Sequence, residues 1–275
     1  MSAPRNRTSI LVGAFNFIDL LFYCIVREVR SDSGGHPVLG IVMAVSKTLS
    51  MIMVFYIAFD IAGIRASPIR GDSMLYLLSG FLLFFLHNSG VSKVVGSNSF
   101  VGPLQQHAPM KPILAIAAAT LATLYLHILA FLIVLLGLYL FRGSVKIHDP
   151  AGLLLPFFLA WASGVVIGLV LMSMKPFAPK LVSIISTFYQ RANMITSGKF
   201  FVANTIPVYA LPFFAWNPLF HTIDQMRGAM FVNYTPHVTS ITYPLMVVGV
   251  GLVIGMMIEF WLRNTVSRST GKSNR

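Results

Sequence analysis

The sequence predicts an all-α integral membrane protein with six transmembrane helices and both termini in the cytoplasm. The first observation behind this prediction is the composition. Of 275 residues, 56% are hydrophobic and only 10% are charged, whereas about a quarter of the residues of soluble globular proteins are charged. Six spans use nearly half of the chain. We therefore expect a single transmembrane domain over residues 1–275, with no separate ATPase or glycosyltransferase domain.

The second observation is a set of six apolar segments. Each is long enough to cross roughly 30 Å of hydrocarbon at about 1.5 Å per helical residue, and the fifth is at the short limit. We expect the spans at about residues 38–59, 74–95, 113–141, 151–174, 181–197 and 243–262.

Residues 10–30 are a rival seventh span, but Asn16 and Asp19 interrupt their apolar run. Apolar residues recur along one face of a helix here, with polar residues mainly off that face. This stripe consists of Leu11, Phe15, Ile18, Phe22 and Ile25. We expect an amino-terminal amphipathic helix lying in the cytoplasmic interface.

The third observation is the distribution of charge. The chain has 20 Lys and Arg against 8 Asp and Glu, a formal net charge of +12. In a membrane protein such an excess is first a topology signal and not a sign of nucleic-acid binding. In the predicted arrangement the cytoplasmic side carries twelve basic residues and the outer side six. This bias supports the orientation with both termini inside.

Two connections between the predicted spans are unusual. Residues 96–111 are rich in Ser, Asn and Gln, which is typical of a short cytoplasmic segment that couples to a partner. Residues 198–242 are rich in Phe and Pro, too apolar for a freely solvated loop. We expect re-entrant or short interfacial helices there, before the last span.

No catalytic, nucleotide or metal motif is evident. Gly271-Lys272-Ser273 resembles the end of a P-loop, but Val266 stands where its first glycine is required. His87 and His127 are expected to be hydrogen-bonded packing residues. The pairs Gly164-x-x-x-Gly168 and Gly251-x-x-x-Gly255 fit either packing within the chain or a dimer seam.

Two cations lie deep within predicted spans. Lys47 and Arg191 follow the starts of their spans by nine and ten residues, which places both near the bilayer midplane. Lys47 either extends toward the cytoplasm or lines a passage. Arg191 either binds a structural partner such as a backbone carbonyl or favours an anionic substrate in that passage.

Four blocks of sequence, in order along the chain, resemble the permease subunits of type-2 ABC exporters for polysaccharide. The nearest are the capsular polysaccharide export permeases and the related O-antigen export permeases. The blocks are Arg27-Glu28-Val29-Arg30 with Leu39-Gly40, Leu77-Leu78-Ser79-Gly80, Met110-Lys111-Pro112-Ile113, and Thr196-Ser197-Gly198-Lys199-Phe200-Phe201 with Ile206-Pro207 and Trp216-Asn217-Pro218-Leu219-Phe220-His221. The last of these, followed by Asp224 and Arg227, is the most specific.

The resemblance implies a homodimeric permease in a bacterial inner membrane. Two separate ABC ATPase subunits would bind ATP and Mg²⁺, so this chain would need no cofactor. The cargo would be a lipid-linked, often acidic polysaccharide. The resemblance leaves open a periplasmic co-polymerase and an outer-membrane exporter as further partners.

The residue patterns and the resemblance together predict roles for particular residues. The substrate pathway would include Lys47 and Arg191. The outer gate would include Trp216, Asn217, His221, Asp224 and Arg227, with Asn217-Pro218 as a helix-start signal. The last two could equally form an i,i+3 pair that only stabilises the gate helix. The ATPase contact surface would include Arg27, Glu28, Asn98, Gln105, Gln106 and Lys111.

Two other classes of protein remain as alternatives. A secondary transporter would normally carry an acidic or histidine relay at the midplane, and no such relay is seen in this sequence. An intramembrane glycan-processing enzyme would need a nucleophile with a base, or a carboxylate facing a lipid headgroup.

Overall fold

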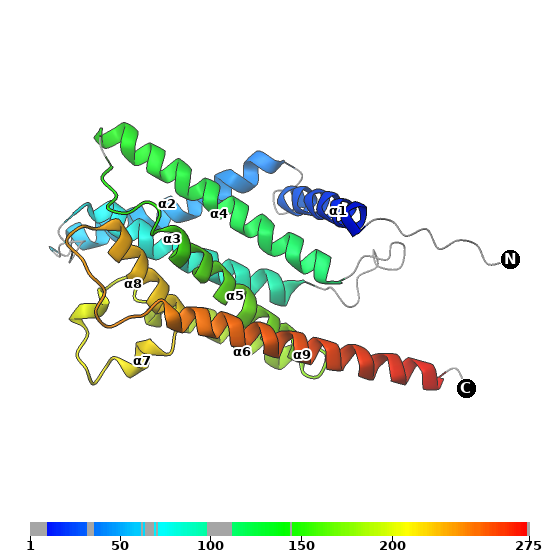
Figure 1. Ribbon diagram of the computed structural model, residues 1–275. Helices are drawn as coiled ribbons and strands as arrows, with labels where there is room; N and C mark the ends of the chain where they lie inside the picture. Colours follow the sequence, from blue (N-terminus) through cyan, green and yellow to red (C-terminus); the bar gives the residue numbers. More distant parts are fainter. Residues whose placement is uncertain are drawn as a thin grey trace.

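The computed structural model describes residues 10–31, 36–61, 63, 69, 71–97, 112–143 and 145–273. Within these ranges the chain forms helices and turns and contains no strand (Figure 1). The α-helices are α1 (Ile10–Ser31), α2 (Pro37–Ile61), α3 (Ser73–Gly96), α4 (Pro112–Arg142), α5 (Leu154–Met174), α6 (Pro179–Thr196), α7 (Pro212–Ala215), α8 (Pro218–Met230) and α9 (Thr242–Ser273).

The six segments expected to span the membrane correspond to α2, α3, α4, α5, α6 and α9. Among the described residues, four helices are long and apolar enough to cross a bilayer: Val38–Ile61, Ser73–Gly96, Leu114–Phe141 and Leu154–Met174. These support an all-helical membrane protein. That α6 and α9 also cross the membrane stays a prediction.

Helix α3 is the centre of the bundle. It packs against α2, α4, α5, α6 and α8, and every residue from Leu75 to Leu86 is buried, together with His87. A helix that is apolar on all sides is covered either by other helices or by lipid, and α3 is covered by other helices. Its first turn is capped by Asp72, whose carboxylate accepts a 2.8 Å hydrogen bond from the Met74 amide.

Glycines allow α5 to approach its neighbours closely. A Cβ on Gly164 would collide with the His87 backbone carbonyl, and one on Gly168 would lie 2.8 Å from Val94 Cβ, both on α3. Likewise, a Cβ on Gly251 of α9 would collide with Val166 of α5. Of the two interpretations of the Gly-x-x-x-Gly pairs, the structure therefore shows packing within the chain.

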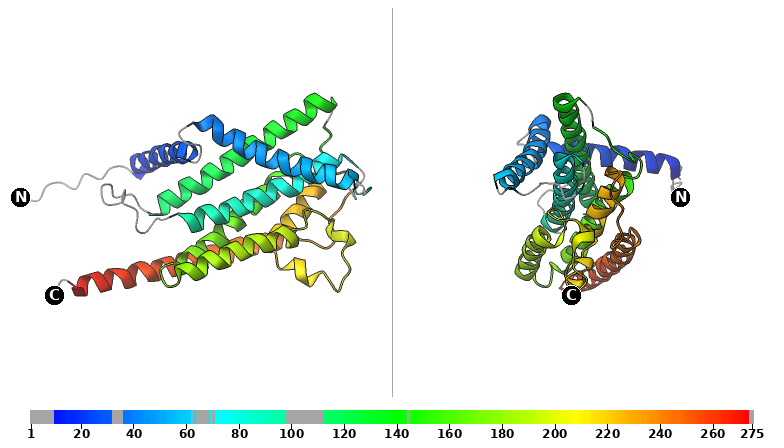
Figure 2. Two further views of the ribbon diagram at one scale, coloured as in Figure 1. Left: turned by 180° about the vertical axis from the view of Figure 1, so that it is seen from behind. Right: turned by 90° about the vertical axis from the view of Figure 1, so that its left-hand side faces the viewer.

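Helix α1 lies across one end of the bundle (Figure 2). It packs on α4 through two small clusters, in which Cys24 meets Leu114 and Val29 meets Leu126. Phe22, from the predicted apolar stripe, is 62% exposed on the other side. The side chains of Leu11 and Phe15 lie outside the described residues. The apolar surface of α1 is therefore shared between α4 and the exterior.

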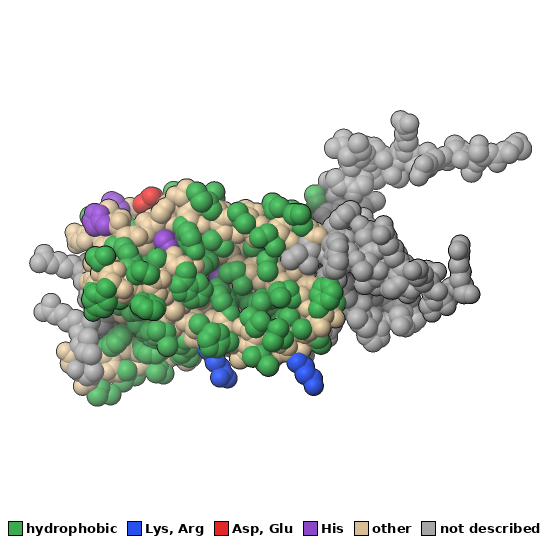
Figure 3. All heavy atoms as spheres, turned by 90° about the horizontal axis from the view of Figure 1, so that it is seen from below, with side chains coloured by type: hydrophobic (Ala, Val, Ile, Leu, Met, Phe, Trp, Pro, Cys, Tyr) green, Lys and Arg blue, Asp and Glu red, His purple; other side chains and the backbone are tan. Residues whose placement is uncertain are grey.

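The two ends of the bundle carry different helices. α1 and the carboxyl-terminal end of α9 lie at one end, and α7 and α8 lie at the other (Figure 1). Hydrophobic side chains cover much of the described part of the face seen in Figure 3, and Lys or Arg side chains stand out from it at one edge. Many large apolar side chains are exposed along α2, α4 and α9, as expected of surfaces that face lipid.

Candidate functional site

The segment 198–242 is organised around α8, and Asn217 starts that helix. Its side-chain oxygen accepts a 3.0 Å hydrogen bond from the Leu219 amide, and Pro218 occupies the first helical position. The helix-start signal in the sequence is therefore confirmed. Asn217 also donates hydrogen bonds to Asn193 at 2.9 Å and Thr196 at 2.8 Å, both on α6. The cap thus joins α8 to α6.

His221 and Asp224 connect α8 to the chain on either side of it. His221 Nε2 donates to the Ala215 carbonyl at 2.9 Å, and its Nδ1 accepts from the Ser240 amide at 3.1 Å. Burial lowers the pKa of His221, which favours this neutral form. The Asp224 carboxylate accepts hydrogen bonds from the hydroxyls of Tyr234 and Thr239. Burial, followed by this bond to Asp224, raises the pKa of the Tyr234 phenol.

Arg227 fixes the turn that follows α6. Its guanidinium donates to the carbonyls of Gly198 at 2.9 Å, Lys199 at 2.7 Å and Phe201 at 2.6 Å. It also lies 4.0 Å from the centroid of the Tyr76 ring on α3. Gly198 supplies the positive φ of 74° at which the chain leaves α6, and the guanidinium provides donors for carbonyls that lie beyond the helix.

The proposed i,i+3 pair between Asp224 and Arg227 is not formed. Each side chain is almost fully buried and is bonded to the partners described above instead. The two residues do stabilise the segment, but through separate contacts to loops that are distant in sequence. Trp216 differs from the other predicted gate residues, because its side chain is 46% exposed while its indole N–H donates to the Phe213 carbonyl.

A polar seam joins α6 to α3 along the length of their contact. We define it by three hydrogen-bonded pairs: Ser92 with Gln190 at 2.9 Å, His87 with Tyr189 at 2.8 Å, and Asn88 with Asn193 at 3.0 Å. Asn193 continues the seam to Asn217. Such side chains hold membrane helices together where apolar packing gives no preference over lipid.

His87 is the best-connected member of this seam. Its Nδ1 donates to the Ala160 carbonyl of α5 at 3.0 Å, so its Nε2 accepts from the Tyr189 hydroxyl. His127 is bonded within α4, to the Thr123 carbonyl at 2.8 Å. Both histidines are therefore hydrogen-bonded packing residues, as the sequence analysis expected.

Lys199 is a buried cation that sequence reasoning assigned to the outer loop. Its side chain has no exposed surface, and Nζ has no hydrogen-bond partner. The ammonium lies 3.2 Å from the centroid of the Phe84 ring. Burial lowers the pKa of Lys199 from 10.5 to about 7. Nothing in the sequence marked this lysine as buried, because its neighbours in space come from α3.

The two deep cations on the helices remain exposed in the single chain. Lys47 of α2 lies with its ammonium 4.6 Å from the ring centroid of Phe85. The Arg191 side chain on α6 is exposed, and no hydrogen bond or ion pair is formed by it within the described part of the chain. The structure therefore does not show the backbone partner that one interpretation of Arg191 required.

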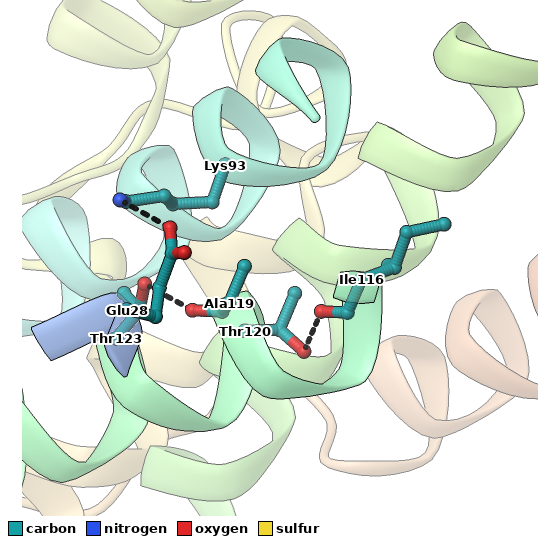
Figure 4. A network of polar contacts seen from close by, with 6 residues as sticks. All are labelled: Glu28, Lys93, Ile116, Ala119, Thr120 and Thr123. Atoms are coloured by element: carbon teal, nitrogen blue, oxygen red, sulfur yellow. Dashed lines mark hydrogen bonds and ion pairs between the residues drawn. The ribbon is translucent and has the colours of Figure 1, made fainter. Parts of the chain in front are cut away.

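Of the residues expected at the ATPase contact surface, two can be placed. Glu28 is half-buried and accepts a 3.1 Å hydrogen bond from the Lys93 ammonium, so it ties α1 to α3 beside Ala119 and Thr123 of α4 (Figure 4). Arg27 is exposed next to it. The other members of the set, Asn98, Gln105, Gln106 and Lys111, lie outside the described residues.

Sequence reasoning missed the polar seam and Lys199. The seam did carry a signal, because each of Ser186, Tyr189, Gln190 and Asn193 is three or four residues from two of the others, which places all four on one helix face. No comparable pattern surrounds Lys199.

Comparison with known proteins identifies a distant relative. No family model matches the chain. The chain is 24% identical over 233 residues to the polysialic acid transport protein KpsM of Escherichia coli, an alignment that covers 85% of this chain and 89% of that protein. This similarity confirms, as a distant relationship, the resemblance to polysaccharide export permeases that the sequence motifs indicated.

Proposed function

We propose that this protein is the permease subunit of an ATP-driven exporter that moves a lipid-linked capsular or related polysaccharide across the bacterial inner membrane. The observation that carries the proposal is the alignment with a polysialic acid transport protein over most of both chains. The four apolar helices support it, and so does α1, an amphipathic helix that lies across one end of the bundle. Two copies of the chain and two ABC ATPase subunits form the working complex.

In this proposal, α2, α3, α4, α5, α6 and α9 all cross the membrane with both termini in the cytoplasm. Support comes from the end of the bundle that carries α1. Arg27 and Arg30 lie on α1, Lys93 is bound to Glu28 of that helix, and Lys175 donates to the Val95 carbonyl near the same end of α3. Basic residues favour the cytoplasmic side of a membrane. The segment 198–242 then lies at the outer side, and Phe22 of α1 contacts lipid headgroups and acyl chains.

The passage for the polymer would lie between two copies of the chain, lined or flanked by Lys47 and Arg191. A Lys or Arg at mid-membrane costs about 2.5 to 3.5 kcal/mol even on insertion scales, so exposure of Arg191 to lipid is unfavourable. A second copy facing α6 across an aqueous passage removes that cost and places positive charge along the route of an acidic polymer.

The proposed gate residues would act mainly by positioning. Asn217, His221, Asp224 and Arg227 are buried and bonded within the segment, so they keep the outer helices in one arrangement and do not bind the polymer themselves. At the other end, Arg27 and the loop before α4 would contact the ATPase, and Glu28 would transmit that contact to α3 through Lys93.

The test is deletion of the gene, followed by extraction and fractionation of cellular glycans. We expect polymer to accumulate in the cytoplasm and to return to the surface when the parental gene is restored. An ABC ATPase should co-purify with the tagged permease. Normal amounts of surface polymer in the deletion strain would overturn the proposal.

A further inference from the structure

The Lys199 ammonium occupies an aromatic cluster with no acceptor. The centroids of the Phe84, Phe200 and Phe81 rings lie 3.2, 4.9 and 5.5 Å from Nζ. Among the buried nitrogen and oxygen atoms of the described side chains, few lack a hydrogen bond, and Lys199 Nζ is the one that belongs to a lysine. Aromatic rings surround the ammonium, but all three of its N–H donors are left without an acceptor.

This arrangement is costly in the observed structure. Ring faces attract a cation, but they replace water and an anionic partner incompletely. The site disfavours charge, as shown by the lowered pKa of Lys199. A methionine would fill the same space without an unsatisfied charge, and apolar replacements of buried charges are often neutral or stabilising. An unsatisfied buried group of this kind calls for an explanation, and a partner in another state of the protein would supply one.

The position of Lys199 on a turn allows such a second state. The turn is held by Arg227 through backbone carbonyls only, so the lysine side chain can leave the cluster without breaking these bonds. Phe200 is half-buried, and its ring centroid lies 4.9 Å from Nζ and 4.7 Å from the ring centroid of Phe55 on α2. Movement of Phe200 would uncover the ammonium.

Lys47 indicates the side of the bundle toward which the Lys199 side chain would emerge. Phe84 and Phe85 are neighbours on α3, with ring centroids 5.4 Å apart. Lys199 lies over the first ring and Lys47, which is exposed, lies over the second. The buried cation and the exposed cation thus share one aromatic patch between α2 and α3.

We propose that Lys199 is an anion-binding residue of the outer passage, which the aromatic cluster stores in the closed state and which binds an acidic group of the exported polymer when Phe200 moves aside. This inference rests on the proposed export function, and it names the substrate class as an acidic polysaccharide. The chemistry recognised is a carboxylate or phosphate, carried either by the sugars or by the lipid end of the cargo.

The first experiment compares Lys199→Met with the parent in the deletion strain. The variant should reach the membrane in parental amounts and be at least as heat-stable, yet deliver about tenfold less polymer to the surface, as expected for loss of one charged contact. Lys146→Met, which removes an exposed lysine, is the matched control. Failure of the parental gene itself to restore polymer would reject the export function, whereas parental export by Lys199→Met would reject this inference alone.

The second experiment measures exposure directly. The permease–ATPase complex in nanodiscs is treated with formaldehyde and borane, and dimethylation of Lys199 is followed by peptide mass spectrometry. Lys199 should be protected at rest and labelled about tenfold faster during ATP turnover, as expected if the fraction of molecules with an accessible Lys199 rises about tenfold. Lys146 should be labelled equally in both states. Equal protection of Lys199 in both states overturns the proposal.

Added probes then distinguish the source of the anion. Oligosialic acid should restore protection of Lys199 if the sugars carry the acidic group, and phosphatidic acid should do so if the lipid end carries it. Dextran of matched length is the neutral control. Protection by dextran as strong as by either anion would show steric cover without charge recognition and would contradict the proposal.

Discussion

The Lys93 ammonium on α3 donates a 3.1 Å hydrogen bond to the Glu28 carboxylate on α1. This contact joins the helix that lies across the end of the bundle to the helix at its centre (Figure 4). Both side chains are about a quarter exposed, so the pair adds little to stability, and its significance lies in what it connects. A displacement of α1 reaches α3, and α3 contacts α8.

Glu28→Gln should therefore uncouple the two ends of the protein with little effect on folding. A partly exposed ion pair contributes about 0.2–1 kcal/mol, so the melting temperature should change only slightly. We expect export to fall while ATPase activity of the purified complex persists. The double variant Glu28→Lys with Lys93→Glu should recover part of the export, and the exposed Asp19→Asn should behave as the parent. A double variant no better than either single variant would contradict a role for the pair.

Arg191→Leu should reduce export of an acidic polymer while assembly stays intact, because it removes an exposed charge from the proposed passage. Loss of one charged contact corresponds to about a tenfold effect. Surface polymer and co-purification of the ATPase are the measurements. Lys146→Leu, outside the predicted spans, controls for the loss of a positive charge. Full export by Arg191→Leu would remove this residue from the pathway.

Asn217→Ala should destabilise the protein by about 1–3 kcal/mol, because it removes the cap of α8 and the hydrogen-bond donor to the side-chain oxygens of Asn193 and Thr196. The measurement is thermal unfolding in detergent. Asn233→Ala, an exposed position in the same segment, should change stability by less than about 0.5 kcal/mol. Similar effects of the two substitutions would show that the bonds of Asn217 to α6 are unimportant.

Gly164→Ala should separate α5 from α3, because the added methyl group would collide with the backbone carbonyl of His87. Overpacking of this kind costs about 1–3 kcal/mol. Gly137→Ala on α4 is the matched control, since a Cβ there meets nothing within 4 Å. We expect lower heat stability and yield for the first variant alone. If Gly164→Ala were as stable as Gly137→Ala, the close approach of the two helices would be wrong.

Lys199 should make stability depend on pH. Because its pKa is about 7 in the folded protein and 10.5 as its ordinary value, the unfolded chain holds a proton between these values that the folded chain lacks. Stability then rises with pH across this window, and below pH 7 the full penalty of the buried charge applies. Lys199→Met removes this contribution. The melting temperature of Lys199→Met should exceed that of the parent most near pH 7 and least near pH 10. A difference in melting temperature that does not change with pH would contradict the lowered pKa.

Much of the fold could be predicted because the membrane imposes a simple rule on sequence. An apolar segment of about 20 residues must form a helix, since unpaired backbone groups are intolerable in lipid. The helices α2 to α5 follow directly from this rule. The cap at Asn217 was also predictable, because an Asn-Pro pair before an amphipathic stretch is a local signal whose physics involves only adjacent residues.

The site was less predictable because its contacts are distant in sequence. Asp224 and Arg227 are spaced to pair on a helix, yet each binds a loop instead. Arg227 donates to backbone carbonyls of the turn after α6, and Asp224 accepts from the Tyr234 hydroxyl. The hydrogen bond between His87 and Tyr189 joins residues about a hundred positions apart. No periodicity in one segment can reveal which face of another segment it will meet.

By itself, the sequence determined that this is a helical membrane protein, where its apolar segments lie, and which family its motifs resemble, since these depend on composition and local order. Only the tertiary structure decided that Lys199 is buried among aromatic rings, that Arg191 is exposed, and that Glu28 is bound to Lys93. The reason is physical. Whether a charge is stored, paired or exposed depends on what packs beside it, and packing in this protein brings together helices that are far apart along the chain.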